Sequence, residues 1–240
     1  MILSQEFKKV KRTGFIPTFL VGGLLAAAFP VLNTAVRSEN YLGLPDTPLQ
    51  ILLDANWPMM ALLNVLLIVG GACLMYYTEY ADNAIQKMKS LPLKESTMFF
   101  GKAVLLSIMY VIVLTIETLS FIFSSFHWFG LYNGFWLELG KSFGYFFLLG
   151  LPSIMLSLLI ASAFKNMWVS LGISVIGVFM ATMIYNMSFI LSLFPYAMPF
   201  QIFGGTDPNR VLQFICAAFI GIIVIGIAEL IFLKVRRSFE

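Results

Sequence analysis

The chain has 240 residues, of which 60% are hydrophobic and 11% are charged, and its net charge is +3. Soluble domains usually contain about 45–50% apolar and about 25% charged residues, so this composition excludes a water-soluble fold. No long polar stretch provides a separate globular domain, and no basic domain is present for nucleic acid. We therefore expect one all-α, polytopic integral membrane domain over residues 1–240.

Six apolar stretches are long enough to span a bilayer, which takes roughly 20 residues in a helix. They lie at 14–36, 57–77, 103–124, 139–164, 168–194 and 212–233.

The distribution of lysine and arginine predicts the orientation, because these residues are enriched in cytoplasmic loops. An even number of spans places both termini on one side. Of the 15 basic residues, the terminal side carries all but Arg37, Lys141 and Arg210. The others are Lys8, Lys9, Lys11, Arg12, Lys87, Lys89, Lys94, Lys102, Lys165, Lys234, Arg236 and Arg237. We therefore expect cytoplasmic N- and C-termini.

The tryptophans are an independent check on this topology, since indole rings prefer the membrane interface. All four lie at or near the ends of expected spans. Trp57, Trp128 and Trp136 would lie at the outer interface and Trp168 at the inner one.

The longest cytoplasmic loop is expected at residues 78–102, between the second and third spans. Its apolar residues recur at three- and four-residue spacing, which predicts a short amphipathic helix ended by Pro92. These residues are Ala81, Ala84, Ile85, Met88 and Leu91. Lys87 and Lys89 lie elsewhere on the helical wheel. Such a helix would either rest on anionic lipid headgroups or dock a cytoplasmic partner.

A second amphipathic segment precedes the first span at residues 6–12. It is either a basic topology anchor or a partner-binding elbow, and the two roles are compatible.

The outer segment between the last two spans, residues 194–200, contains two prolines among aromatic residues. Proline cannot continue a regular helix, so we expect short helices that dip into the outer leaflet. A plain hydrophobic loop is the alternative.

Two carboxylates fall within expected spans, where an ionisable group is costly. Glu229 is close enough to Lys234 to reach the interface or to pair with nearby bases. Glu117 lies deeper and could pair with a hydroxyl or amide, hold a proton, or line a substrate path.

The chain lacks the sequence motifs of several enzyme classes. It has no GxxxxGK[ST] phosphate loop, no HExxH or GxSxG motif, and one histidine, His127. We therefore expect no catalytic or metal site and no bound cofactor. Energy from ATP would have to come from a partner.

The order of these features resembles the permease subunits of type 2 ABC transporters, particularly the small permeases of lantibiotic immunity and resistance. The resemblance covers the whole chain. It rests on the basic start, the cytoplasmic stretch 79–102, the outer segment 194–200 and the short basic tail from Lys234.

This resemblance implies a multi-pass subunit of the bacterial plasma membrane that works with two ATP-binding subunits and a second or homologous permease. ATP and Mg²⁺ would bind the ATPase. The implied coupling helix comprises Ala81, Ile85, Lys87, Met88, Lys89 and Leu91, followed by Lys94. The implied connecting elbow contains Phe7, Lys8, Lys11 and Arg12, and the outer re-entrant segment contains Phe194, Pro195, Tyr196, Pro199 and Phe200. The expected cargo is a lantibiotic-like antimicrobial peptide or another amphipathic substrate, exported or expelled from the membrane.

Two other functions are compatible with the same residues. One is an ion-coupled secondary carrier that uses Glu117. The other is a non-transporting membrane scaffold or sensor partner that recruits a protein through residues 81–91.

Overall fold

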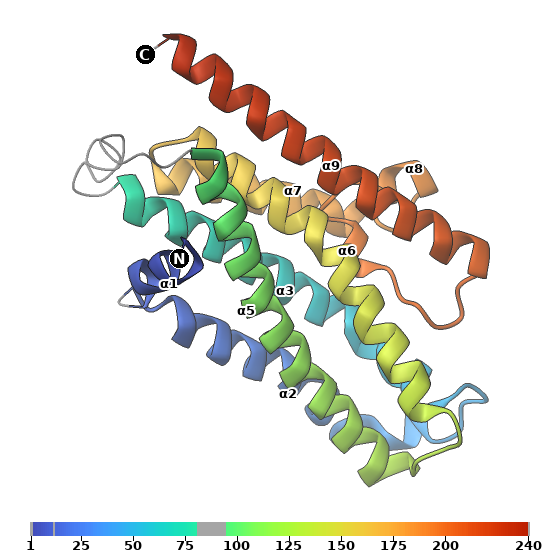
Figure 1. The fold of residues 1–240 in the computed structure, drawn as a ribbon. Helices are drawn as coiled ribbons and strands as arrows, with labels where there is room; N and C mark the ends of the chain where they lie inside the picture. Colours follow the sequence, from blue (N-terminus) through green and yellow to red (C-terminus); the bar gives the residue numbers. More distant parts are fainter. Residues whose placement is uncertain (1, 12, 81–94, 240) are drawn as a thin grey trace.

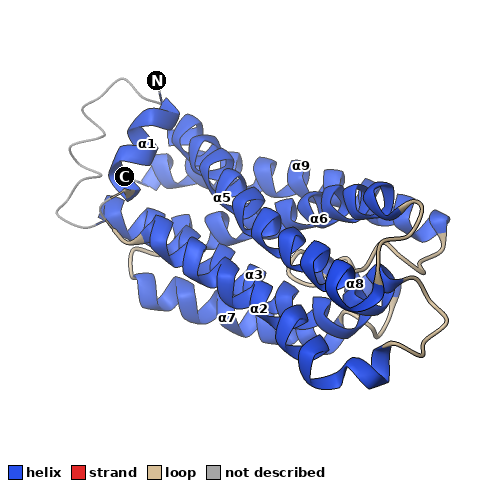
Figure 2. Ribbon diagram, turned by 90° about the horizontal axis from the view of Figure 1, so that it is seen from below, coloured by secondary structure: helices blue, strands red, loops and turns tan. Residues whose placement is uncertain are grey.

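The computed structural model describes residues 2–11, 13–80 and 95–239, in which the regular elements are helices (Figure 2). In chain order they are α1 (Ile2–Val10), α2 (Phe15–Tyr41), α3 (Pro48–Tyr80), α5 (Glu95–Ser124), the π-helical turn η2 (Ser125–Phe129), α6 (Phe135–Ala163), α7 (Met167–Ile184), α8 (Phe189–Ser192), the 3₁₀ turn η3 (Met198–Phe200) and α9 (Pro208–Phe239).

Among the described residues, 6 helices are long and apolar enough to cross a membrane, which confirms the expected number. Most extend past the expected limits. For example, α3 begins at Pro48 rather than at residue 57, and α5 begins at Glu95 rather than at residue 103. Hydropathy ends a span where polar residues begin, whereas a helix can continue until a residue or cap breaks it.

The fifth span was expected to reach residue 194, and this boundary is wrong. Helix α7 ends at Ile184, and a separate short helix, α8, follows. Ser188 has an extended backbone, and its hydroxyl accepts a hydrogen bond from the Leu191 amide, which caps α8. One continuous apolar run therefore holds two elements, a division that hydropathy alone does not show.

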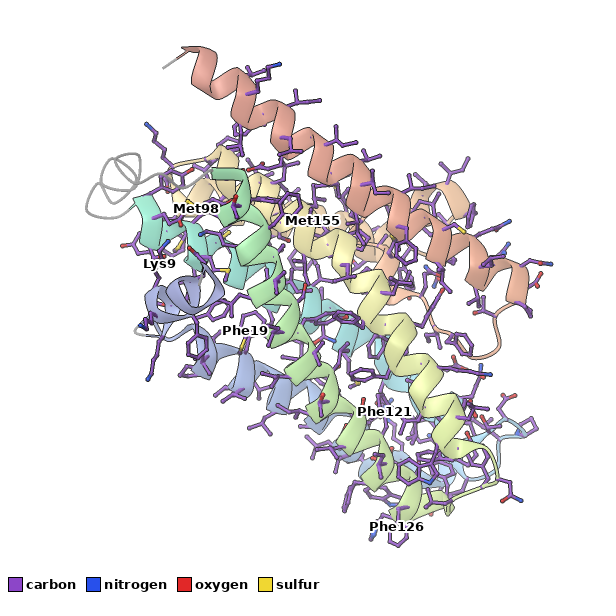
Figure 3. The ribbon with its side chains drawn as sticks, viewed as in Figure 1. Lys9, Phe19, Met98, Phe121, Phe126 and Met155 are labelled. Carbon is purple, nitrogen blue, oxygen red and sulfur yellow. The ribbon has the colours of Figure 1, made fainter. Side chains whose placement is uncertain are left out.

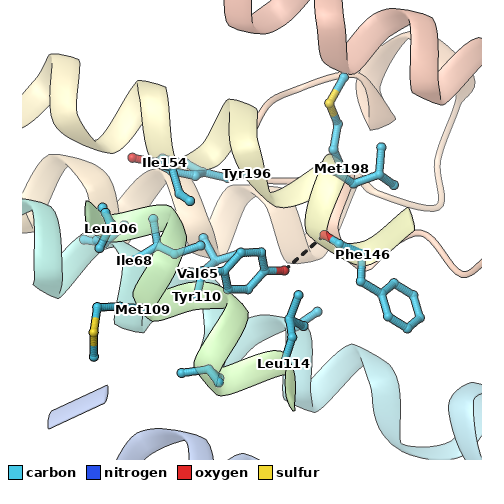
Figure 4. Close-up of a cluster of buried hydrophobic side chains, with 14 of the residues drawn as sticks. Val65, Ile68, Leu106, Met109, Tyr110, Leu114, Phe146, Ile154, Tyr196 and Met198 are labelled. Carbon is cyan, nitrogen blue, oxygen red and sulfur yellow. Dashed lines mark hydrogen bonds between the residues drawn. The ribbon is translucent and has the colours of Figure 1, made fainter. Parts of the chain in front are cut away.

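Helix α3 is the centre of the bundle (Figure 1). It contacts α1, α2, α5, α6 and α7, and α9 packs mainly against α6. Two close contacts between helices depend on glycine. A Cβ on Gly71 of α3 would lie 2.7 Å from the ring of Phe19, and one on Gly150 of α6 would lie 2.2 Å from the ring of Tyr110. The Tyr110 hydroxyl donates to the Phe146 carbonyl oxygen at 3.2 Å (Figure 4).

Both chain ends lie at one end of the bundle, together with the ends of α3 and α5 that flank residues 81–94 (Figure 1). We call this the terminal end. Lys9 and Met98 lie there, whereas Phe121 and Phe126 lie toward the opposite end (Figure 3).

Trp57, which was expected at the outer interface, is buried inside the bundle. Its side chain is 1% exposed and stacks on Phe146, with 3.5 Å between ring centroids. Because α3 starts at Pro48, Trp57 lies inside the helix rather than at its end. Trp136 and Trp168 are exposed, as interfacial residues can be.

Candidate functional site: a buried ion-pair network at the terminal end

Three helices, α1, α3 and α5, bring charged residues together at the terminal end. Glu6 and Val10 are four residues apart on α1, so they share a face, and both are buried. Glu79 lies in the last turn of α3. Lys102 of α5 lies one turn after the buried Phe99, on the same face.

Lys102 is the centre of this ion-pair network. Its side chain is 1% exposed, and its Nζ lies 2.6 Å from Glu6 Oε2 and 2.5 Å from Glu79 Oε1. Lys9 adds a second cation, with its Nζ 2.6 Å from Glu6 Oε1 and 3.2 Å from Glu79 Oε1. Two carboxylates and two ammonium groups balance in charge, which makes burial of the set tolerable.

The pKa values of the two charged groups on α1, Glu6 and Lys9, reflect the same charge balance. Burial would raise the pKa of Glu6, but the charges of Lys102 and Lys9 and their hydrogen bonds hold it below its usual 4.5. Burial would lower the pKa of Lys9, but the hydrogen bond to Glu6 and the charge of Glu79 raise it above its usual 10.5. Both groups are therefore held in their charged forms when α1 is docked.

Two tyrosines extend the site from the ion pairs to the rest of the bundle. Lys102 Nζ lies 5.4 Å from the ring centroid of Tyr76, a cation–π distance. The Tyr80 hydroxyl donates to the Ser162 carbonyl oxygen at 2.7 Å, and the Ser162 hydroxyl donates to Glu229 Oε2 at 3.0 Å. The last turn of α3 is thus tied to α1 and α5 through Glu79, and to α6 and α9 through Tyr80.

Glu229 was expected either to reach the interface or to pair with nearby bases. The residue is 1% exposed, so its carboxylate does not lie at the surface of the bundle. It accepts the hydrogen bond from Ser162 inside the bundle.

The residues predicted for the coupling helix, Ala81, Ile85, Lys87, Met88, Lys89, Leu91 and Lys94, lie outside the described residues, as does Arg12. Phe7, Lys8 and Lys11 of the predicted elbow are exposed. The elbow does not run directly into the first span. A turn separates α1 from α2, and Gly14 adopts φ +76°, a left-handed conformation that favours glycine.

Sequence reasoning missed the buried members of the site. Glu79 and Lys102 were placed in a loop, where charges are normally solvated. One available signal was their position, because they flank the segment expected to meet the partner.

The outer segment is buried within the protein. Tyr196, Pro199 and Phe200 are buried, while Phe194 and Pro195 are half-buried. Two carbonyl oxygens of this broken backbone accept hydrogen bonds from side chains, as buried backbone groups outside regular helices must. Trp57 Nε1 donates to the Pro199 oxygen at 2.9 Å, and the Ser153 hydroxyl donates to the Pro195 oxygen at 2.6 Å.

Glu117 lies far from the ion-pair network, in the membrane-spanning part of α5. It is 1% exposed, and Asn64 Nδ2 of α3 donates to its Oε2 at 3.0 Å.

Comparison with known proteins agrees with this arrangement. The model of the family described as ABC-2 family transporter protein matches residues 2–182, which hold α1 to most of α7 and all four residues of the ion-pair network. No curated protein and no solved structure matches the chain. Since the family match covers more than half of the sequence, this chain belongs to the ABC-2 family of membrane transporter proteins.

Proposed function

We propose that this chain is the transmembrane permease subunit of an ATP-driven ABC transporter in the bacterial plasma membrane. Residues 1–240 would form one permease domain with its terminal end in the cytoplasm. Membership in the ABC-2 family implies an ABC ATPase as partner. Two such subunits would bind ATP and Mg²⁺, and this chain would pair with a second copy or a homologous permease.

The observation that carries this proposal is the way both ends of the 81–94 segment are anchored. Glu79 and Tyr80 immediately precede it, and Lys102 lies two turns into the helix that follows it. The buried ion pairs of Lys102 join the two ends directly. A partner that moves this segment would therefore displace α3 and α5 together.

Helix α1 would move with them, because Glu6 and Lys9 hold it to the same network. Tyr80 would carry the displacement to α6 and α9 through Ser162. Packed cores and ion-pair networks favour discrete arrangements over gradual deformation, so a small movement at the segment can switch the arrangement of the spans.

For the cargo we infer an amphipathic substrate such as a lantibiotic-like peptide, exported or expelled from the membrane. The connections at the end opposite the termini support a substrate drawn from the membrane. Residues 42–47, 130–134 and 185–207 are each too few to build a soluble binding domain there.

Co-purification in mild detergent tests the proposal. We expect an ABC ATPase to accompany the intact protein and to be lost when Lys87, Met88 and Lys89 are changed together to Ala. Lys165→Ala, which changes an exposed lysine in the connection between α6 and α7, is the control and should retain the ATPase.

Two results would contradict the proposal. One is that no ATPase accompanies the intact protein. The other is a transport activity that needs no ATPase and is abolished by Glu117→Gln, which would indicate an ion-coupled carrier.

A further inference from the structure

A second polar cluster, unused by the proposed coupling, lies where α3, α5 and α6 meet. The Glu117 carboxyl receives one hydrogen bond, from Asn64, at its Oε2. Its Oε1 atom is buried and has no hydrogen-bond partner among the described residues. The Ser142 hydroxyl of α6 is also buried without a hydrogen-bond partner among the described residues, and Ser142 is 2% exposed.

Both residues line one small cavity. Thr118 contributes a third polar group, a second hydroxyl. The rest of the wall is apolar or aromatic and comprises Leu49, Leu53, Trp57, Leu114, Phe121, Leu139, Phe143 and Phe146. The cavity leaves about 10 Å³ for the centre of a water molecule, close to what one ordered water needs.

No lysine, arginine or histidine is among the residues that line this cavity. An ionised carboxylate would therefore have no cation in this wall to balance its charge, which is costly inside a membrane helix. From α3 the site is faced by Asn64 and Trp57, which are uncharged. Tyr110, about two turns before Glu117 on α5, directs its hydroxyl to the Phe146 oxygen.

We propose that this cavity is a proton-holding site in which Glu117 is a neutral carboxylic acid that binds one water molecule. The acid O–H at Oε1 donates to the water oxygen, and the water donates to Ser142 Oγ and Thr118 Oγ1. Thr118 already donates its own hydrogen to the Leu114 oxygen, so its lone pairs are free to accept. Three hydrogen bonds satisfy a buried water, and the chain links α5 to α6 without burying a charge.

Infrared difference spectroscopy tests this site on the intact protein in detergent at neutral pH, where exposed glutamates are ionised. We expect the wild type to show the C=O stretching band of a protonated carboxylic acid, which shifts in D₂O. The band should be lost in Glu117→Gln. Glu138→Gln, near the start of α6, is the control and should keep it. Absence of the band in the wild type would overturn the proposal.

Ser142→Ala tests the water link separately. Loss of one acceptor loosens the water, so the acid band should persist at a shifted frequency. An unchanged band in Ser142→Ala would overturn the water link. Because Gln keeps the shape of Glu117 and an oxygen for Asn64, Glu117→Gln should melt within a few degrees of the wild type. A large loss of stability would show that an ionised carboxylate is needed there, which also contradicts the proposal.

Discussion

Replacing Lys102 with Met removes the central cation of the ion-pair network and keeps an unbranched side chain of similar length. Glu6 and Glu79 would then remain buried, with Lys9 as their remaining cation in the network. Removing one partner of a buried ion pair typically costs about 3–5 kcal/mol. For a chain of this size, that corresponds to a fall of about 6–20 °C in the apparent melting temperature.

The assay is thermal unfolding in detergent, with Lys8→Met as the matched control. Lys8 is an exposed lysine on α1, so the same substitution there should change stability by less than about 0.5 kcal/mol. Adding Glu79→Gln to Lys102→Met should recover part of the loss, because it removes a carboxylate left without its main partner. The reasoning would be refuted if Lys102→Met melted at the same temperature as Lys8→Met.

Three further predictions concern Glu6, the glycines of α6 and Tyr80. The stability difference between wild type and Glu6→Gln should be large at neutral pH. It should begin to shrink as the pH falls through about 4.5, the usual pKa of the unfolded chain, and vanish only below the lowered pKa of folded Glu6, where the carboxyl is protonated in both states. Gly150→Ala should cost about 1–3 kcal/mol by forcing a Cβ into the Tyr110 ring, whereas Gly140→Ala, with nothing within 4 Å, should be neutral or slightly stabilising in the same melts. Tyr80→Phe should lower stability by about 1 kcal/mol through loss of its donated hydrogen bond, and equal melting curves would contradict that contact.

The number of spans could be predicted from the sequence because hydrocarbon thickness demands long apolar runs, and this chain supplies six of them. The end of α7 could not be predicted in this way. Residues 185–194 are as apolar as a membrane helix, and the break depends on the Ser188 cap and on burial of the following segment against α3 and α6. The burial of Trp57 could not be predicted from hydropathy either, because α3 starts earlier than hydropathy indicates.

The candidate site was harder to predict because its charges are paired over long distances in sequence. Lys102 meets Glu6 from 96 positions away and Glu79 from 23 positions away. A hydropathy profile treats each charge as solvated, so it places Glu79 and Lys102 in a loop. A balanced network becomes visible only when α1, α3 and α5 are in contact.

The central claim is that motion of the 81–94 segment reaches the membrane helices through Lys102. It is tested most directly by measuring the distance between spin labels at Leu44→Cys and Leu131→Cys, two exposed positions at the end opposite the termini, in a Cys216→Ser background. The complex would be purified through its ATPase and compared with and without trapped ATP. We predict that ATP trapping shifts this distance in the wild type and in Lys8→Met but not in Lys102→Met. A full shift in a Lys102→Met complex that retains its ATPase would contradict the account.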